Sequence, residues 1–331
     1  MEAVPHEHAV WIETLSAKLR FPLGATIVLL AVGTFLLFLL SRVVAGVPVV
    51  EAAVADVLLF VLLVFPLAIP VYVRRMMVSL EARALSMVED PKGVRKTLAS
   101  LGRLTPVALL SVAIFLSFFV PLAAGAQPGA LFSPELFLFV PFAVAIWISA
   151  TALWTLAYSL VAIYRMGRLP LKLRPFALDR ALGLRPFAST CLRLTGVYYV
   201  LTLLLIAPDI ASPATPAFIY VQDFVLVLFG LPLFLLPLLS LRAKLVAVRS
   251  EKMAWVNAWF HRVMQGVESR EDSELPPGLQ NELASIDKIQ REIQSIKSWP
   301  FDVGAVAKLL TILLSVTAIL LAGVIRKYLG F

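Results

Sequence analysis

The sequence predicts an all-α, polytopic membrane protein with about seven transmembrane helices and a cytoplasmic helical hairpin. Of its 331 residues, 60% are hydrophobic and 15% are charged, whereas soluble domains average roughly 45–50% apolar and about 25% charged residues. Apolar segments of about 20 residues, the length that crosses a bilayer as a helix, recur along the chain. Basic residues gather in alternate loops between them, as in multi-pass proteins.

The net charge and the absence of known motifs limit the classes of function that the sequence allows. The net charge is +8, but the basic residues lie at the ends of apolar segments, where they orient helices and attract anionic lipid. No RNA- or DNA-reading motif accompanies them, so we expect lipid and no nucleic acid as a partner. Common catalytic motifs are absent, which predicts no enzyme activity and no cofactor. His6 and His8 lack further ligands for a metal, and the single Cys191 excludes an internal disulfide.

Residues 1–20 form an amphipathic N-terminal segment. Val10, Trp11, Leu15 and Leu19 recur at helical spacing with charged residues between them, which predicts a helix on the membrane surface. The apolar run that follows is longer than a signal-peptide core, so we expect no cleaved signal. Seven spans are predicted at approximately 24–44, 52–73, 106–124, 136–164, 196–208 with its flanks, 218–241 and 303–325.

Loop charge predicts the orientation of these spans. Lys and Arg are dense after the second, fourth and sixth spans, whereas 125–135 and 209–217 contain neither. Because positive loops stay in the cytoplasm, we expect a plasma-membrane protein with a cytoplasmic N-terminus and an external C-terminus.

The two halves of the chain resemble each other. Asp56 precedes Pro70 by the same fourteen positions that separate Asp223 from Pro237, and Pro66 and Pro232 lie at similar depth. We interpret these four prolines as helix breaks in a 3+1+3 parallel repeat, with chance similarity as the alternative. The predicted units are a first repeat, a linking span, a basic cytoplasmic elbow and a second repeat, at 21–126, 127–165, 166–194 and 195–331.

A cytoplasmic hairpin is predicted at 242–299. Its returning arm carries an apolar stripe at intervals of three or four residues, formed by Leu279, Leu283, Ile286, Ile289, Ile293 and Ile296. In the simpler interpretation the two arms cover each other. Alternatively Trp255 and Trp259, together with Ile286 and Ile293, form a surface that binds a partner or a second copy in a homo-oligomer.

Two patches carry a resemblance. The elbow sequence PFALDRALGLRPFAS and the WPFD before the last span resemble motifs of uncharacterised prokaryotic multi-pass membrane proteins. No activity is attached to that group, so the resemblance implies only a prokaryotic plasma membrane and assigns no functional residue.

Polar residues near the predicted outer ends of the spans are the candidate binding site. Ionisable groups in a span are functional candidates by default, and Asp56, Asp209, Asp223, Arg42 and Arg326 are expected at this level. They favour a channel or transporter with an acidic outer vestibule between proline-broken helices. The alternative is a non-transporting scaffold or sensor whose hairpin oligomerises or recruits a partner.

Overall fold

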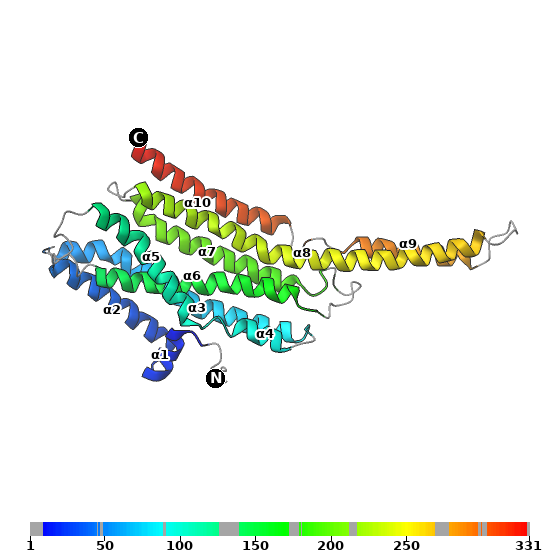
Figure 1. Ribbon diagram of the computed structural model, residues 1–331, viewed down its shortest axis with the longest axis horizontal. Helices are drawn as coiled ribbons and strands as arrows, with labels where there is room; N and C mark the ends of the chain where they lie inside the picture. Colours follow the sequence, from blue (N-terminus) through cyan, green and yellow to red (C-terminus); the bar gives the residue numbers. More distant parts are fainter. Residues whose placement is uncertain are drawn as a thin grey trace.

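A computed structural model describes residues 9–44, 46, 49–88, 91–125, 139–171, 179, 181–211, 217–268, 278–296, 299 and 303–329. These residues form an all-helical protein whose helices run roughly along one axis (Figure 1). Apart from an isolated antiparallel bridge between Val88 and Leu171, no strand pairing occurs among them. The helices are α1 (Trp11–Leu19), α2 (Leu23–Val44), α3 (Val49–Leu85), α4 (Pro91–Leu98), α5 (Leu104–Gly125), α6 (Phe139–Arg168), α7 (Arg185–Ala211), α8 (Ala217–Glu268), α9 (Leu279–Gln294) and α10 (Val303–Leu329).

Five of these helices are long and apolar enough to cross a membrane. They are α2, the part of α3 at Leu62–Leu85, α6, α7 and α8. In the described portions of α5 and α10 the apolar stretches are shorter, Leu104–Val120 and Leu310–Gly323. The predicted all-helical class is therefore confirmed, whereas the count of seven spans is not.

Helix α6, predicted as a link between two repeats, is the centre of the bundle. It packs against α2, α3, α4, α5, α7 and α8. Its buried face carries Thr151, Thr155 and Ser159, whose hydroxyls donate to the carbonyl oxygens four residues earlier at 2.8, 2.6 and 2.7 Å. Because these short polar side chains are satisfied within the helix, neighbouring helices can approach closely.

Two glycines mark the closest approaches of α8 to its neighbours. A Cβ added at Gly167 of α6 would lie 2.6 Å from Oγ of Ser240. A Cβ added at Gly230 of α8 would lie 2.6 Å from Cε1 of Tyr198 and 2.9 Å from Cζ of Tyr199, both on α7. At both positions a larger residue would require a neighbouring side chain to shift, so the glycines favour close packing of α8 on α6 and α7.

The repeat is not confirmed, because the third helix of each half packs differently. Helix α10 packs against α7 and α8, whereas α5 packs against α6. The four prolines also do not end a helix, since Pro66 and Pro70 lie inside α3 and Pro232 and Pro237 lie inside α8. Both helices continue through these positions, and a local distortion at the prolines stays a prediction. A proline removes one backbone hydrogen bond, and neighbouring groups in a spanning helix can compensate for that loss.

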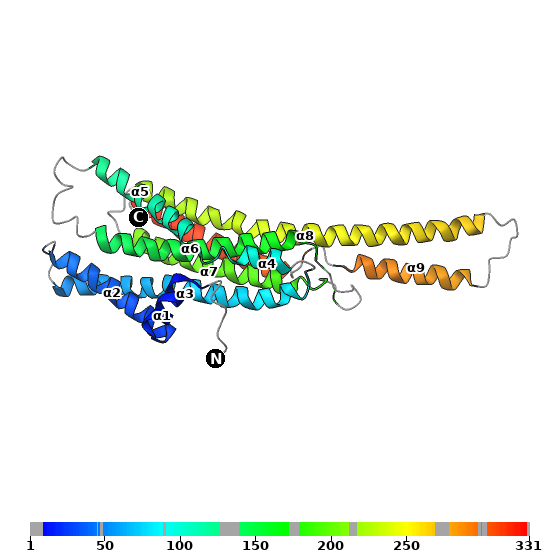
Figure 2. The ribbon, with the colours of Figure 1, turned by 60° about the horizontal axis from the view of Figure 1, so that its bottom comes forward.

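The N-terminal helix α1 is anchored in the bundle. Val10 and Ile12 are buried, and Ile12 joins a cluster with Ala31 of α2 and Leu67 of α3. The indole Nε1 of Trp11 donates to Oγ1 of Thr151 on α6 at 3.2 Å. Figure 2 shows α1 lying across the start of α2 beside α3. The helix predicted for the membrane surface therefore also packs against protein.

Candidate functional sites along helix α8

Helix α8 connects the two regions that the sequence marks as candidate sites. It runs 52 residues without interruption. One end lies beside the end of α7, and the other continues beyond the bundle as an arm of the hairpin with α9 (Figures 1 and 2). We call the end of the bundle from which the hairpin projects the basic end, and the opposite end the far end.

At the far end, Asp209 and Asp223 lie on consecutive helices. Asp209 is in the last turn of α7, and the carboxylates of the two residues repel each other electrostatically. The hydroxyl of Tyr220 donates to the carbonyl oxygen of Asp209 at 3.3 Å. Asp223 is only 7% exposed, and its Oδ2 has no hydrogen-bond partner. The two aspartates therefore form an acidic pair that the sequence did not single out, since it matched Asp223 with Asp56.

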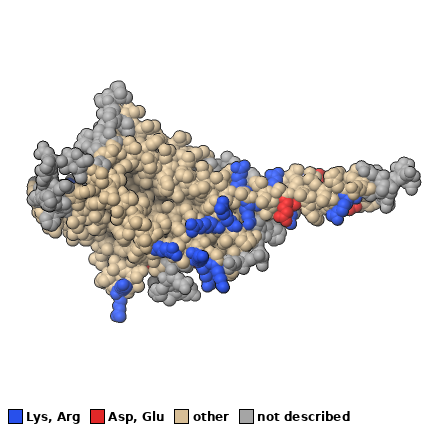
Figure 3. All heavy atoms as spheres, viewed as in Figure 1, with Lys and Arg blue, Asp and Glu red and all other residues tan. Residues whose placement is uncertain are grey.

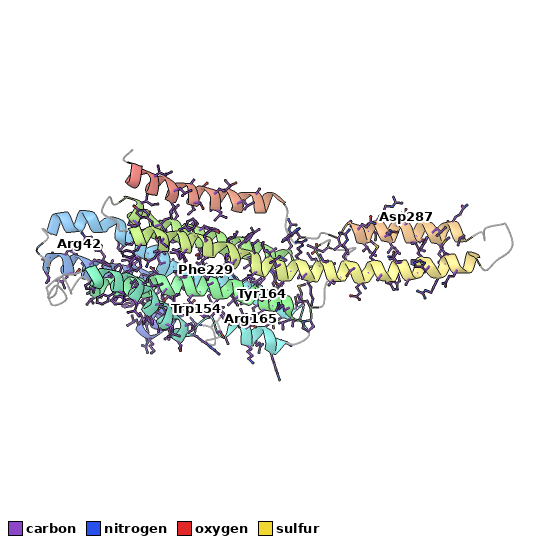
Figure 4. All side chains as sticks on the ribbon, turned by 45° about the horizontal axis from the view of Figure 1, so that its top comes forward. Arg42, Trp154, Tyr164, Arg165, Phe229 and Asp287 are labelled. Atoms are coloured by element: carbon purple, nitrogen blue, oxygen red, sulfur yellow. The ribbon has the colours of Figure 1, made fainter. Side chains whose placement is uncertain are left out.

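Of the other predicted vestibule residues, only Arg42 has a side chain that the structure describes. Arg42 is in the last turn of α2, a helix that packs against α1, α3 and α6; Figure 4 shows Arg42 at the far end of the bundle. The side chains of Asp56 in α3 and Arg326 in α10 lie outside the described residues. The backbone of α10 does approach the pair, because a Cβ at Gly323 would lie 3.0 Å from Cγ2 of Ile210.

Helices α3 and α8 were expected to line a common path. Instead α6 and α7 lie between them, since each packs against both α3 and α8. One of the two matched proline pairs also differs in exposure, because Pro66 is buried and Pro232 is exposed, whereas Pro70 and Pro237 are both buried. In the part of the chain that the structure describes, α6 and α7 thus separate α3 from α8.

Polar groups continue from the acidic pair into the α7–α8 interface. The hydroxyl of Tyr198 donates to the carbonyl oxygen of Leu226 at 2.6 Å. The buried hydroxyl of Tyr199 packs against Gly230 and has no hydrogen-bond partner. Sequence reasoning missed these tyrosines. The available signal was the adjacent pair Tyr198-Tyr199 in an apolar helix, because a buried tyrosine hydroxyl usually requires a partner.

The hairpin is a self-covered pair of helices. Ile286 and Ile293 of α9 are buried in the same core cluster as Leu245 and Val256 of α8. Their predicted packing inside the hairpin is therefore found, and the alternative role of these two isoleucines as a partner surface is corrected. The spacing of α9 places them on one side of the helix, which α8 covers.

The two hairpin tryptophans differ in exposure. The indole Nε1 of Trp259 donates to Oε1 of Glu282 on α9 at 3.3 Å, which ties this ring to the hairpin. Trp255 stands beside it, with ring centroids 5.7 Å apart, yet is 52% exposed. Val246 and Phe260 are also exposed apolar residues of this arm. Among the described aromatic residues of the hairpin, Trp255 therefore has the most exposed side chain.

The base of the hairpin is fixed to the bundle. The ammonium group of Lys244 donates to the carbonyl oxygen of Leu169, directly after α6, at 2.9 Å. The guanidinium of Arg242 lies over the ring of Trp299, 4.6 Å from its centroid. Asp179 organises the nearby turn, since its carboxylate accepts from the amides of Ala181 and Gly183 at 2.9 and 2.8 Å.

Positive charge gathers at the basic end. Figure 3 shows Lys and Arg side chains grouped where the hairpin leaves the bundle, with none on the visible apolar body beyond them except near α1. Tyr164 and Arg165 lie at this end in Figure 4. The guanidinium of Arg168 stacks over Tyr164 at 4.6 Å. The basic end thus combines positive charge with aromatic rings.

The described residues contain no group of three His, Cys, Asp or Glu side chains placed to hold a metal ion. The fold is compatible with the class of helical membrane proteins. No family model, curated protein or solved structure matches the chain, so function is inferred from its residues and their geometry.

Proposed function

We propose that this chain is a multi-pass membrane scaffold or sensor whose cytoplasmic hairpin binds a helical partner, a second copy being the first candidate. One observation carries the proposal: α8 continues without interruption from an apolar spanning segment into the hairpin, where Trp255 is exposed. A rigid helix can transmit a displacement at the membrane to the hairpin. An exposed tryptophan is the type of residue that dominates binding energy at interfaces.

The proposal includes seven spans in a plasma membrane, with the N-terminus inside and the C-terminus outside. Large apolar side chains on α5 and α10 support the two additional spans, because Leu109 and Leu314 are 69% and 67% exposed. Such exposure suits contact with lipid. The concentration of basic residues at the hairpin end supports a cytoplasmic hairpin by the positive-inside rule, and the C-terminus lies at the opposite end (Figure 1).

A second copy is the first candidate because a two-helix hairpin has a thin core. Small helical units are commonly stabilised by association. The exposed Val246, Trp255 and Phe260 lie on the arm that α9 covers on one side only. Pairing two hairpins through these residues would remove apolar surface from water at both copies.

The test is the mass of the full-length protein in detergent or nanodiscs, measured by light scattering. We expect a dimer or larger assembly, and Trp255→Ser should weaken it because truncating a central interface tryptophan typically costs about 2 kcal/mol or more. Asn257→Ser is a matched control, since Asn257 is an exposed neighbour on the same helix. A monomer at all concentrations, with no photocrosslink from residue 255 to any protein in cells, would exclude the hairpin as a binding element.

Transport of a cation is the second candidate function. It is favoured by the buried acidic pair at the far end, because carboxylates in a spanning segment are common in ion pathways. Flux measurements in liposomes test it: the parent protein should carry a cation current that Asp223→Asn reduces. A parent protein that carries no ion would remove this candidate and leave the scaffold.

A further inference from the structure

Asp223 is the only acidic residue that is buried among those the structure describes. It belongs to α8, six residues after the start of that helix at Ala217. Its Oδ2 is inaccessible and has no hydrogen-bond partner, and no ion pair between described side chains involves its carboxylate. An ionised carboxylate in that setting is costly, because burial removes water that no described group replaces at Oδ2. Asp223 is thus a site whose negative charge requires a compensating positive charge.

The side chains that the structure describes around Asp223 do not supply that charge. Helix α7 contributes Asp209, whose carboxylate adds like-charge repulsion. On α8, Tyr220 one turn earlier directs its hydroxyl to the backbone of Asp209. Ile206, Val227, Val316 and Leu320 form an apolar cluster, in which Val227 lies one turn after Asp223 on α8. Arg326 and Lys327 lie in the last turns of α10, and their side chains are outside the described part of the structure.

We infer that Asp223, with Asp209 beside it, binds a cation at the far end of the α7–α8 pair, either a proton or an alkali-metal ion. A single positive charge removes both the desolvation cost at Asp223 and the repulsion between the carboxylates. The inference concerns equilibrium binding, so it depends neither on the hairpin scaffold nor on ion flux. It also assigns Asp223 a partner from solution rather than from the fold.

Thermal unfolding of the full-length protein in detergent tests this inference. The Tm is measured in NaCl, KCl and N-methylglucamine chloride at matched ionic strength, and over a pH series. For a bound metal ion, we expect the Tm to rise with Na⁺ or K⁺ but not with N-methylglucamine, because a ligand that binds only the folded state stabilises it. For a bound proton, the Tm rises as the pH falls and the three salts give the same curve.

Substitutions at Asp223 and Asp209 test whether the dependence of the Tm on cations or pH arises from this acidic pair. Asp223→Asn should abolish the dependence on salt or pH, and Asp209→Asn should weaken it. Asp287→Asn is the matched control, because Asp287 is an exposed hairpin residue that pairs with Arg291. If the parent Tm responds to neither cations nor pH and Asp223→Asn lowers it, Asp223 is paired with a basic group of the protein and the inference is wrong.

If Asp223→Asn fails to fold, chemical labelling of the parent protein tests the same inference. Dicyclohexylcarbodiimide adds to a protonated carboxyl group, and acyl transfer to nitrogen leaves an N-acylurea that retains both reactants. Mass spectrometry should locate this adduct on Asp223. Protection by Na⁺ or K⁺ identifies a metal ion, whereas labelling that increases at low pH without salt protection identifies a proton. No adduct at Asp223 in any salt or at any pH would overturn the inference.

Discussion

The ammonium group of Lys244 donates a hydrogen bond to the carbonyl oxygen of Leu169, 2.9 Å away, and so joins the base of the hairpin to the end of α6. Leu169 directly follows the last residue of α6, Arg168. Carbonyl groups at a helix C-terminus lack partners within the helix and carry partial negative charge. The contact therefore couples the arm of the hairpin to the central helix of the bundle.

Replacing Lys244 with Met should loosen the hairpin base while the bundle stays folded. A cation at a helix C-terminus contributes about 0.3–1 kcal/mol, and up to about 2 kcal/mol when partly buried. We expect faster amide hydrogen exchange in 242–250 and a small decrease in Tm. Lys252→Met is the control, because Lys252 is exposed on the same arm. Equal exchange in both variants would show that the contact does not restrain the hairpin.

The hairpin itself should be disrupted by charge in its seam. Replacing Ile286 and Ile293 with Asp removes two buried apolar groups and places carboxylates in the seam, which should cost several kcal/mol locally. Limited proteolysis should then cut the hairpin rapidly while the membrane-embedded fragments remain intact. Ala284→Asp with Gln294→Asp adds the same charge at exposed positions and should leave the cleavage pattern unchanged. Similar cleavage of the two double variants would contradict the packing of α9 on α8.

Substitution of Gly230 tests the close contact of α7 and α8. A Cβ there would lie 2.6 Å from Tyr198 and 2.9 Å from Tyr199, and overpacking a tight interface costs about 1–3 kcal/mol. Gly230→Ala should therefore lower the Tm in detergent. Gly33→Ala in α2 is the control, because nothing lies within 4 Å of a Cβ at that position. The Tm of this control should be unchanged or higher, since alanine is a better helix former than glycine.

The sequence predicted features that depend on local spacing. The stripe on 279–296 indicated the hairpin because residues three and four apart share a helix face, and Ile286 and Ile293 are buried as that spacing requires. Hydropathy likewise identified α6, α7 and α8 as helices. In each case the signal lies within one segment of the chain.

Features that depend on packing partners were not predictable in the same way. The central position of α6 and the proximity of Asp209 to Asp223 depend on which helices pack together. Apolar spans offer few sequence cues for that choice, because one lipid-compatible face resembles another. Cys191 shows the same limit: it was expected in a basic cytoplasmic loop, but α7 begins at Arg185 and buries this thiol.

The burial of Cys191 determines how the topology must be tested. The predicted elbow at 166–194 would place this thiol in a cytoplasmic loop, but a fully buried side chain should react with no impermeant reagent. In a Cys191→Ala background, Asn257→Cys on the hairpin should be labelled only after permeabilisation. Gln127→Cys, in the predicted external loop, should be labelled in intact cells. Labelling of residue 257 in intact cells would reverse the proposed orientation.

The last prediction concerns the ion pair between Glu13 of α1 and Arg74 of α3. The two side chains are 15% and 9% exposed and in contact, which joins the N-terminal helix to the bundle. Glu13 also accepts a hydrogen bond from the amide of Val10 at 3.2 Å, so its carboxylate organises the start of α1 as well. Removing one partner of a buried pair leaves an uncompensated charge, which typically costs about 3–5 kcal/mol.

We therefore expect Glu13→Gln to lower the Tm and to increase hydrogen exchange across α1. Lys18→Gln, on the exposed end of the same helix, is the control and should change neither. The double variant Glu13→Gln with Arg74→Met removes both charges and should recover a large part of the lost stability, because a pair replaced as a whole leaves no charge buried. If the double variant is as unstable as the sum of its single variants, the two side chains do not interact energetically, and α1 is held instead by apolar contacts such as those of Val10 and Ile12 and by the hydrogen bond of Trp11.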